Sequence, residues 1–194
     1  MKKKSQLKYE QILAETVNLI NEKDVAMVST NQVAKKVGIS QSNIYIYFKN
    51  RDDLISQVFT TEVNKMSAFV IERIETRPTD NLKAKFELTF TVLFQYALKF
   101  PKSMTVIQKI LQSYAYTHMQ DQSAAYSKAN GMLVASLDAG IATGLLKPID
   151  RTLLQNIIFS TIKLHADNLH RGRYTERDVP FDQVAAMIWD AISA

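Results

Sequence analysis

Apolar residues recur along most of this chain at steps of three and four residues, the spacing of one face of an α-helix. Only 5 Gly and 4 Pro occur among 194 residues, so few positions favour a break. The clearest stripe has four-residue spacing and ends at Phe100-Pro101; it comprises Leu82, Phe86, Phe90, Phe94 and Leu98. The pattern predicts an all-α protein of about nine helices.

Capping and breaking residues set the expected helix boundaries. Pro78 cannot continue a helix, Pro101 fits a first helical position, and Gly144 ends a helical pattern. The polar segment 171–174 is expected to be a loop. The expected helices span about 7–20, 30–37, 41–47, 51–75, 82–98, 101–116, 122–143, 150–170 and 180–192.

The segment from Ser29 to Phe48 carries the features of a helix-turn-helix. Ser29 is a good N-cap, and Ala34 is small where two helices cross closely. Gly38 supplies the positive φ that ends a helix in a tight turn, and Ser40 can cap the second helix. The shared core is expected to consist of Val33, Val37, Ile39, Ile44 and Phe48.

The second short helix exposes an uncharged polar face. With Ile44 and Phe48 turned inward, the exposed side chains are Gln41, Ser42, Asn43, Tyr45 and Tyr47. Gln and Asn can pair with adenine edges, Ser bonds several bases, and Tyr hydroxyls suit phosphates. The alternative is that two helices merely pack together and face water. The flanking basic residues favour DNA reading; they are Lys35, Lys36, Lys49 and Arg51.

Positive charge is concentrated at the N-terminal end. Residues 1–51 hold nine Lys or Arg and four acidic residues, whereas the net charge of the whole chain is +5, so residues 52–194 are neutral overall. A basic head on a neutral body suits a polyanion-binding domain, although an ordinary solvated surface would give the same count. The basic start, Lys2 to Lys4, is expected to be a flexible solubilising tail; the alternative is an arm that adds DNA-backbone contacts.

The run from Ser29 to Leu54 resembles the DNA-binding domain of the tetracycline-repressor (TetR) family. The family pattern is roughly Thr-x-x-x-Ile-Ala-x-x-x-Gly-Val-Ser, a gap of three, aliphatic-Tyr-x-Tyr-Phe, then Lys-Glu-x-Leu. The matching positions here are Ser29, Val33-Ala34, Gly38-Ile39-Ser40, Ile44-Tyr45, Tyr47-Phe48 and Arg51-Asp52-Asp53-Leu54. Ser42, Ile46 and Arg51 replace the commoner Gly, Arg and Lys. Ile46 is expected either to touch a thymine methyl or simply to pack.

The resemblance implies a role for each DNA-facing residue. Thr30 and Asn31 begin the first motif helix against the DNA backbone and a base edge. Gln41, Ser42 and Asn43 are the main readers of sequence. The phosphate contacts are Tyr45, Tyr47, Lys49 and Arg51. Residues 1–50 would form the DNA-binding domain, and residues 51–194 an effector-binding and dimerisation domain.

The resemblance also implies a homodimer joined through the last two helices and a pocket enclosed by the middle ones. The expected interface residues are Leu154, Ile158, Ile162, Phe181, Val184 and Ile188. The expected pocket residues are Phe86, Phe90, Phe94, Met104, Ile107, Tyr114, His118, Met132 and Leu133. For both sets a plain intrachain core is the alternative. Lining of this kind would suit an apolar or aromatic effector.

The expected function is a cytoplasmic, ligand-responsive repressor that binds an inverted-repeat operator as a dimer. Effector binding would swing the 51–75 helix and change the spacing of the two reading heads. The alternatives are a helical DNA-organising protein without an effector and a helical enzyme. We expect no cofactor, metal or membrane contact, because Cys is absent, no apolar run reaches the length of a span, and His118, His165 and His170 lack metal-binding spacing.

Overall fold

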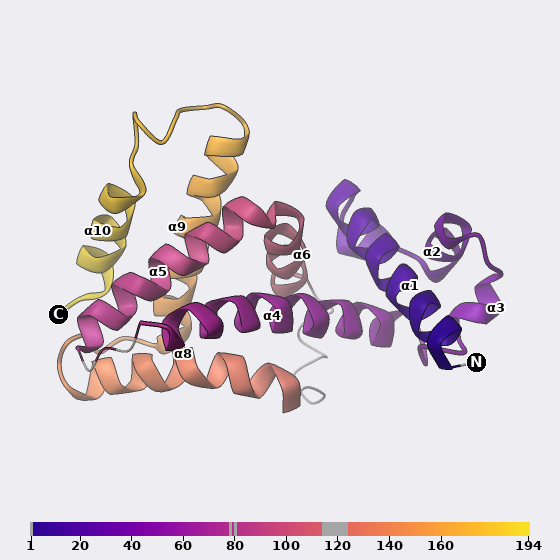
Figure 1. Cartoon of the computed structure of the whole chain (residues 1–194), viewed down its shortest axis with the longest axis horizontal. Coiled ribbons are helices and arrows are strands. Elements are labelled where there is room, and N and C mark those ends of the chain that lie inside the picture. The colour runs from indigo at the N-terminus through magenta and orange to yellow at the C-terminus, as the bar shows by residue number, and fades with distance from the viewer. Residues whose placement is uncertain (1, 78, 80, 114–123) are drawn as a thin grey trace. The chain divides into compact units, whose positions relative to one another are not determined.

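The computed structural model describes residues 2–77, 79, 81–113 and 124–194, and for residues 2–4, 124–130 and 132 it describes only the backbone. Along the described residues the chain forms nine α-helices and one 3-10 turn (Figure 1), which confirms the predicted all-α class. The chain divides into two compact units, one of residues 1–63 with 102–124 and one of residues 64–101 with 125–194. This division differs from the one expected after residue 50.

The first unit holds the predicted helix-turn-helix. Its elements are α1 (Lys2–Glu22), η1 (Val25–Met27), α2 (Thr30–Val37), α3 (Gln41–Ile44), the start of α4 (Arg51–Glu75) and nearly all of α6 (Pro101–Leu111). The helix α3 ends earlier than predicted. The amides of Ile46 and Tyr47 bond the carbonyls three residues earlier, on Asn43 and Ile44, so the chain tightens into a turn.

The capping and turn residues of the motif act as predicted, with one exception. Ser29 and Gln32 form a reciprocal capping box at the start of α2, and Gly38 ends that helix at φ +72°. Val33, Ala34, Ile44 and Phe48 are buried as expected, whereas Val37 and Ile39 are half-buried. The exception is Ser40, which stands at the N-cap of α3 but bonds the Ser42 hydroxyl instead of a backbone amide.

The end of α1 is held by a lysine from α6. The Lys109 ammonium lies 2.7, 3.1 and 3.0 Å from the carbonyl oxygens of Ile20, Asn21 and Lys23. These carbonyls lie at the C-terminal end of α1, where helical partners run out and the helix dipole attracts cations. The cap explains why residues 102–111 belong to the first unit although they follow α5 in sequence.

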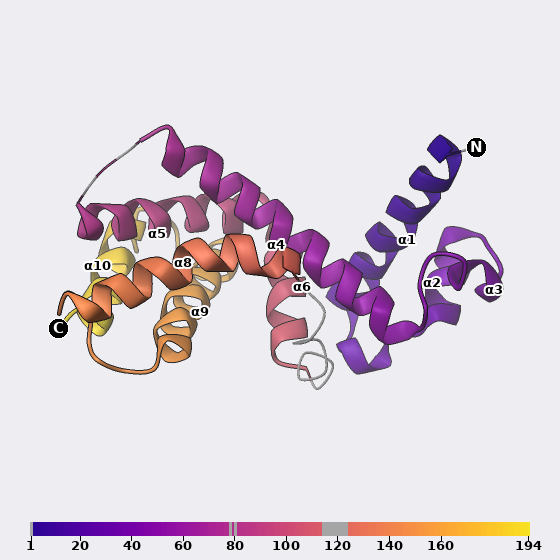
Figure 2. The same cartoon turned by 90° about the horizontal axis from the view of Figure 1, so that it is seen from below.

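The second unit contains the rest of α4 together with α5 (Leu82–Lys99), α8 (Ala124–Ala142), α9 (Arg151–His170) and α10 (Phe181–Ile192). The helices α5, α9 and α10 pack on one another. The helix α8 lies next to α5 and the second half of α4 in both views (Figures 1 and 2). Leu146 and Ser193 form an isolated antiparallel β-bridge near the end of the chain.

Aromatic rings fill the core among α5, α9 and α10. The rings of Phe94 and Phe181 stack with centroids 4.0 Å apart, and His165 lies beside both. His165 is 3% exposed, and its Nδ1 pairs with the Tyr174 hydroxyl at 3.0 Å. Burial lowers the pKa of His165 below its ordinary value of 6.5, and the nearby Glu176 carboxylate opposes that shift. The imidazole is therefore part of the apolar core and not an exposed titrating group.

The six residues predicted for the dimer interface belong to this core. Their exposed fractions lie between 0 and 7% in the isolated chain, so their side chains are already covered by the chain's own helices; they are Leu154, Ile158, Ile162, Phe181, Val184 and Ile188. The prediction is corrected for a physical reason. Helical periodicity shows which side of a helix is apolar, but it does not show whether the same chain or a partner covers it.

Candidate functional site

The outer surface of the helix-turn-helix presents the polar side chains that the sequence singled out, but several already have partners. The amide nitrogen of Gln41 lies 2.9 Å from the Thr30 hydroxyl and 3.4 Å from the Tyr45 hydroxyl. Thr30 and Tyr45 are themselves 3.3 Å apart. This triangle ties the start of α2 to α3 and its following turn. Thr30 is 5% exposed, so its side chain belongs to this hydrogen-bond network. The prediction that Thr30 contacts DNA is therefore corrected.

Two amide side chains remain exposed and without partners. Asn31 on α2 and Asn43 on α3 are exposed, and neither side chain bonds another described residue. Ser42 is also exposed, although its hydroxyl lies 2.8 Å from that of Ser40. In Gln41 the nitrogen is occupied, whereas no bond is found to its side-chain oxygen. Asn31 and Asn43 can therefore bond a base edge without breaking an existing contact, and of the two Asn43 lies on α3.

Ile46 and the two tyrosines complete the face. Ile46 is 73% exposed, so it does not pack into the core. Tyr45 is 50% exposed. Tyr47 is half-buried beside Tyr9, which stacks on Phe48 with ring centroids 5.3 Å apart. The surface thus offers a methyl-bearing side chain next to phenols, a combination suited to a thymine methyl and neighbouring phosphates.

Arg51, predicted to hold a phosphate, is engaged inside the unit. Its Nε donates to the Val28 carbonyl at 2.7 Å and its Nη2 donates to the Val25 carbonyl. Its Nη1 pairs with Asp52 at 3.0 Å. All three nitrogens of the guanidinium therefore hold the segment before α2 against the start of α4. Lys49 is exposed and forms no ion pair among the described residues, so it retains a free positive charge.

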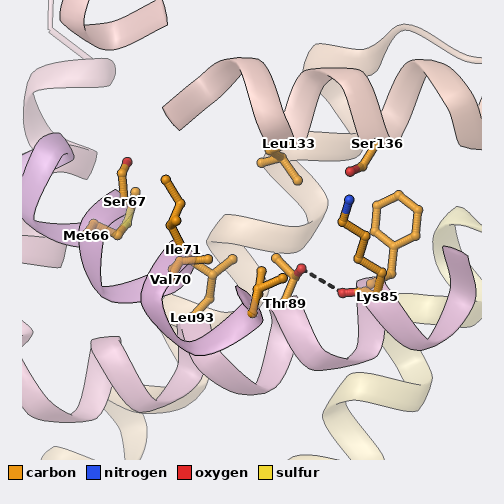
Figure 3. Close-up of a pocket in the computed structure, with 11 residues that line it drawn as sticks. Met66, Ser67, Val70, Ile71, Lys85, Thr89, Leu93, Leu133 and Ser136 are labelled. Atoms are coloured by element: carbon orange, nitrogen blue, oxygen red, sulfur yellow. Dashed lines mark hydrogen bonds between the residues drawn. The ribbon is translucent and has the colours of Figure 1, made fainter. Parts of the chain in front are cut away.

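The second unit contains an apolar cavity between α4, α5 and α8 (Figure 3). Its volume is about 80 Å³, more than the roughly 10–15 Å³ that a single water requires. The lining residues are Met66, Ser67, Val70, Ile71, Ile74, Lys85, Phe86, Thr89, Leu93, Leu133 and Ser136. They include one charged residue, Lys85, and a single aromatic ring.

Of the nine residues predicted to line a pocket, two line this cavity: Phe86 and Leu133. Phe90 and Phe94 are buried in the same unit but do not line it, and Phe94 stacks on Phe181. Met104 and Ile107 are buried in the first unit, so the prediction that they line the pocket is corrected. Tyr114 and His118 lie outside the described residues, and the Met132 side chain is not described.

The α4 wall of the cavity has a signal of its own in the sequence. Met66, Val70 and Ile74 recur every four residues and lie on one face of α4. The residues predicted to line a pocket include none from the 51–75 helix, because that helix was expected only to move when the effector binds. A long helix that links two units can supply binding residues as well as a connection.

No described helix is long and apolar enough to cross a membrane. The described His, Asp and Glu side chains form no group of three that could hold a metal ion. Among the described residues, the helix-turn-helix face and the α4–α5–α8 cavity are the two candidate sites.

Residues 12–58 match the family model of bacterial regulatory proteins of the tetR family, a span that contains the whole helix-turn-helix. The chain belongs to the TetR family. In structure it is similar over its full length to a TetR family transcription regulator from Marinobacter aquaeolei VT8, with a TM-score of 0.82, 22% identity and coverage of 100% and 99% of the two chains.

Two further matches are to regulators from Bacillus subtilis. The chain is 26% identical over 163 residues, 82% of each protein, to the fatty acid metabolism regulator protein of Bacillus subtilis. It also matches the structure of the regulator FadR from Bacillus subtilis in complex with stearoyl-CoA, with a TM-score of 0.64, 21% identity and coverage of 94% and 96%. TetR-family proteins are transcription regulators, so this chain is a DNA-binding regulator and not an enzyme.

Proposed function

We propose that the chain is a ligand-responsive homodimeric repressor that binds an inverted-repeat operator through its two helix-turn-helix heads. The observation that carries the proposal is the exposed face of α3 and its following turn, where the side chains of Asn43 and Ile46 form no hydrogen bond or ion pair with another described residue. One such head reads only a few base pairs, so a specific site requires two. Binding to chromosomal DNA would place the protein in the cytoplasm.

Each residue of the face has a proposed task. Asn43 pairs with a base edge, with Asn31, Ser42 and the side-chain oxygen of Gln41 as further polar contacts. Ile46 contacts a thymine methyl. Tyr45, Tyr47 and Lys49 approach phosphates, which fix the register of the head but carry no sequence information. Arg51 positions the motif from within and makes no phosphate contact.

The dimer interface is proposed on the exposed side of α9 and α10. Leu153 and Leu164 are 50% and 58% exposed on α9, and Met187 is 68% exposed on α10. Leu153 and Leu164 are eleven residues apart, about three helical turns, and therefore lie on one stripe. The exposed Asn156 and Ser160 lie between them on that stripe. Large apolar side chains left uncovered on two packed helices are typical of a surface that a second copy covers.

The effector is proposed to bind in the α4–α5–α8 cavity. A ligand of ordinary size needs roughly 300–1,000 Å³, several times the volume present, so binding must move the lining helices apart. Because α4 is one unbroken helix from Arg51 to Glu75, a displacement of its cavity wall is transmitted along the helix. The ligand favours the DNA-free state only by its higher affinity for the widened conformation.

The proposed function is tested by selection of binding sites from a random DNA library with the purified full chain. We expect enrichment of an inverted repeat whose half-sites are centred about 10–10.5 base pairs, or a multiple of that, apart. Protection of such a site should cover two successive major grooves on one side of the duplex. Enrichment of no sequence, or of a single unrepeated half-site, would contradict the proposal.

A further inference from the structure

One lining residue of the cavity does not suit an apolar ligand. Lys85 is half-buried on α5, and its ammonium has no ion-pair or hydrogen-bond partner among the described residues. The eleven lining residues include no Asp or Glu. A cation at the wall of an apolar space loses hydration without gaining a partner, so it favours an anion from outside the chain.

The other lining residues of the cavity determine which chemistry the remainder of the ligand can have. In Figure 3 the Lys85 side chain extends from α5 toward Ser136 on α8, while Met66, Val70 and Ile71 lie on the α4 side. Thr89 is not a free donor here, since its hydroxyl bonds the Lys85 carbonyl at 2.7 Å. The charge is thus confined to one end of an apolar space.

We propose that the effector is an anionic amphiphile with an unbranched apolar tail, and that Lys85 binds its acid group. This proposal rests on the proposed function, since it names the ligand of that cavity. Flexible aliphatic walls fit a linear tail better than a stack of rings, because Phe86 is the one aromatic lining residue. An anionic amphiphile differs from the apolar or aromatic effector that the sequence predicts.

The anionic end can come from two sources, a free carboxylate or the phosphates of a coenzyme A thioester. The relative crystallised with stearoyl-CoA shows that the second source exists for this fold. An unbranched tail of eight carbons serves as the probe. Octanoate, octanoyl-CoA and octanol therefore share one tail and differ in the head group alone.

The test is a calorimetric titration of the full chain with these three ligands, repeated with Lys85→Met and Lys83→Met. Lys83 is a matched control because it lies on the same helix, is exposed and pairs with Glu87 at 3.8 Å, outside the cavity lining. We expect the wild-type protein to bind one of the two anions at least about tenfold more tightly than octanol. Lys85→Met should remove that preference while leaving octanol binding unchanged, and Lys83→Met should preserve it.

Each other outcome is informative. Equal binding of octanol and both anions, or equal effects of the two lysine substitutions, would overturn the role of Lys85 while leaving a ligand-responsive repressor intact. Binding of none of the three would overturn the amphiphile class. Preference for octanoate identifies the carboxylate as the source, and preference for octanoyl-CoA identifies the thioester. Failure of the repressor itself is seen separately, in the library selection without ligand.

Discussion

Replacing Leu164 by Asp is expected to convert the dimer into monomers and to weaken operator binding by at least about a hundredfold. Leu164 is 58% exposed on α9, so the substitution causes little harm within the chain but places a carboxylate in the proposed apolar interface. Two linked heads bind a two-part operator with a gain of roughly 10²–10⁴ over one head, and separation of the protomers removes this gain.

Sedimentation velocity at micromolar concentration and operator titration at fixed salt measure the two effects. Gln95→Asp is the matched control, since it adds one carboxylate at an exposed position on α5 away from the α9 stripe. The control should remain dimeric with unchanged operator affinity. A Leu164→Asp protein that stays dimeric, or monomers that keep full operator affinity, would show that α9 does not form the interface.

Replacing Arg51 by Met is expected to destabilise the helix-turn-helix by about 3–6 kcal/mol, because it removes two hydrogen bonds from a charged group, each of which contributes roughly 1.5–3 kcal/mol. The side chain donates to the carbonyls of Val25 and Val28 and pairs with the exposed Asp52. The exposed ion pair adds little, so the two carbonyl bonds carry the effect. Their loss should loosen the segment that leads into α2.

Amide hydrogen exchange of residues 30–37 measures this effect locally, whereas fluorescence of Trp189 would follow the second unit. Arg51→Lys keeps the charge but lacks the planar fork, so it should also accelerate exchange. Lys49→Met is the control; it should leave exchange nearly unchanged but reduce the salt dependence of DNA binding by about one charge. Unchanged exchange in Arg51→Met would return Arg51 to the list of phosphate contacts.

The fold was largely predictable because its boundaries depend on single residues. Pro101 begins α6, Gly144 follows α8 at φ +71°, and Ser29 caps α2 with Gln32. These residues act through backbone geometry, which short sequence patterns record. The hydrogen bonds of Arg51 join residues 23 and 26 positions apart, and no local pattern reports such a pairing.

The cavity could not be read from the aromatic stripe for a geometric reason. A four-residue step turns an α-helix by somewhat more than one full turn, so a stripe at this spacing winds slowly around the helix. Phe86 consequently faces the cavity, whereas Phe94, two steps later, stacks on Phe181. The sequence does not single out Lys85, because an isolated lysine is ordinarily a surface residue. Its place beside the cavity depends on α8, which is distant in sequence.

Part of the helix-turn-helix face was predictable from the sequence and part was not. The sequence identified Gln41, Ser42 and Asn43 as exposed polar residues of the second helix, and all three are exposed. It did not show that the Gln41 amide is already bonded to Thr30, since that contact joins two helices. The structure thereby shifts the main reading role within the proposed site toward Asn43.

The most direct test of this account is the affinity of Asn43→Ala for the selected operator and for random DNA at one salt concentration. If Asn43 reads a base, operator binding should weaken by about 1–3 kcal/mol while binding to random DNA changes little. Lys49→Met should weaken both to a similar degree, because phosphates are present in every sequence. Equal losses of Asn43→Ala on operator and random DNA would contradict sequence reading by the α3 face.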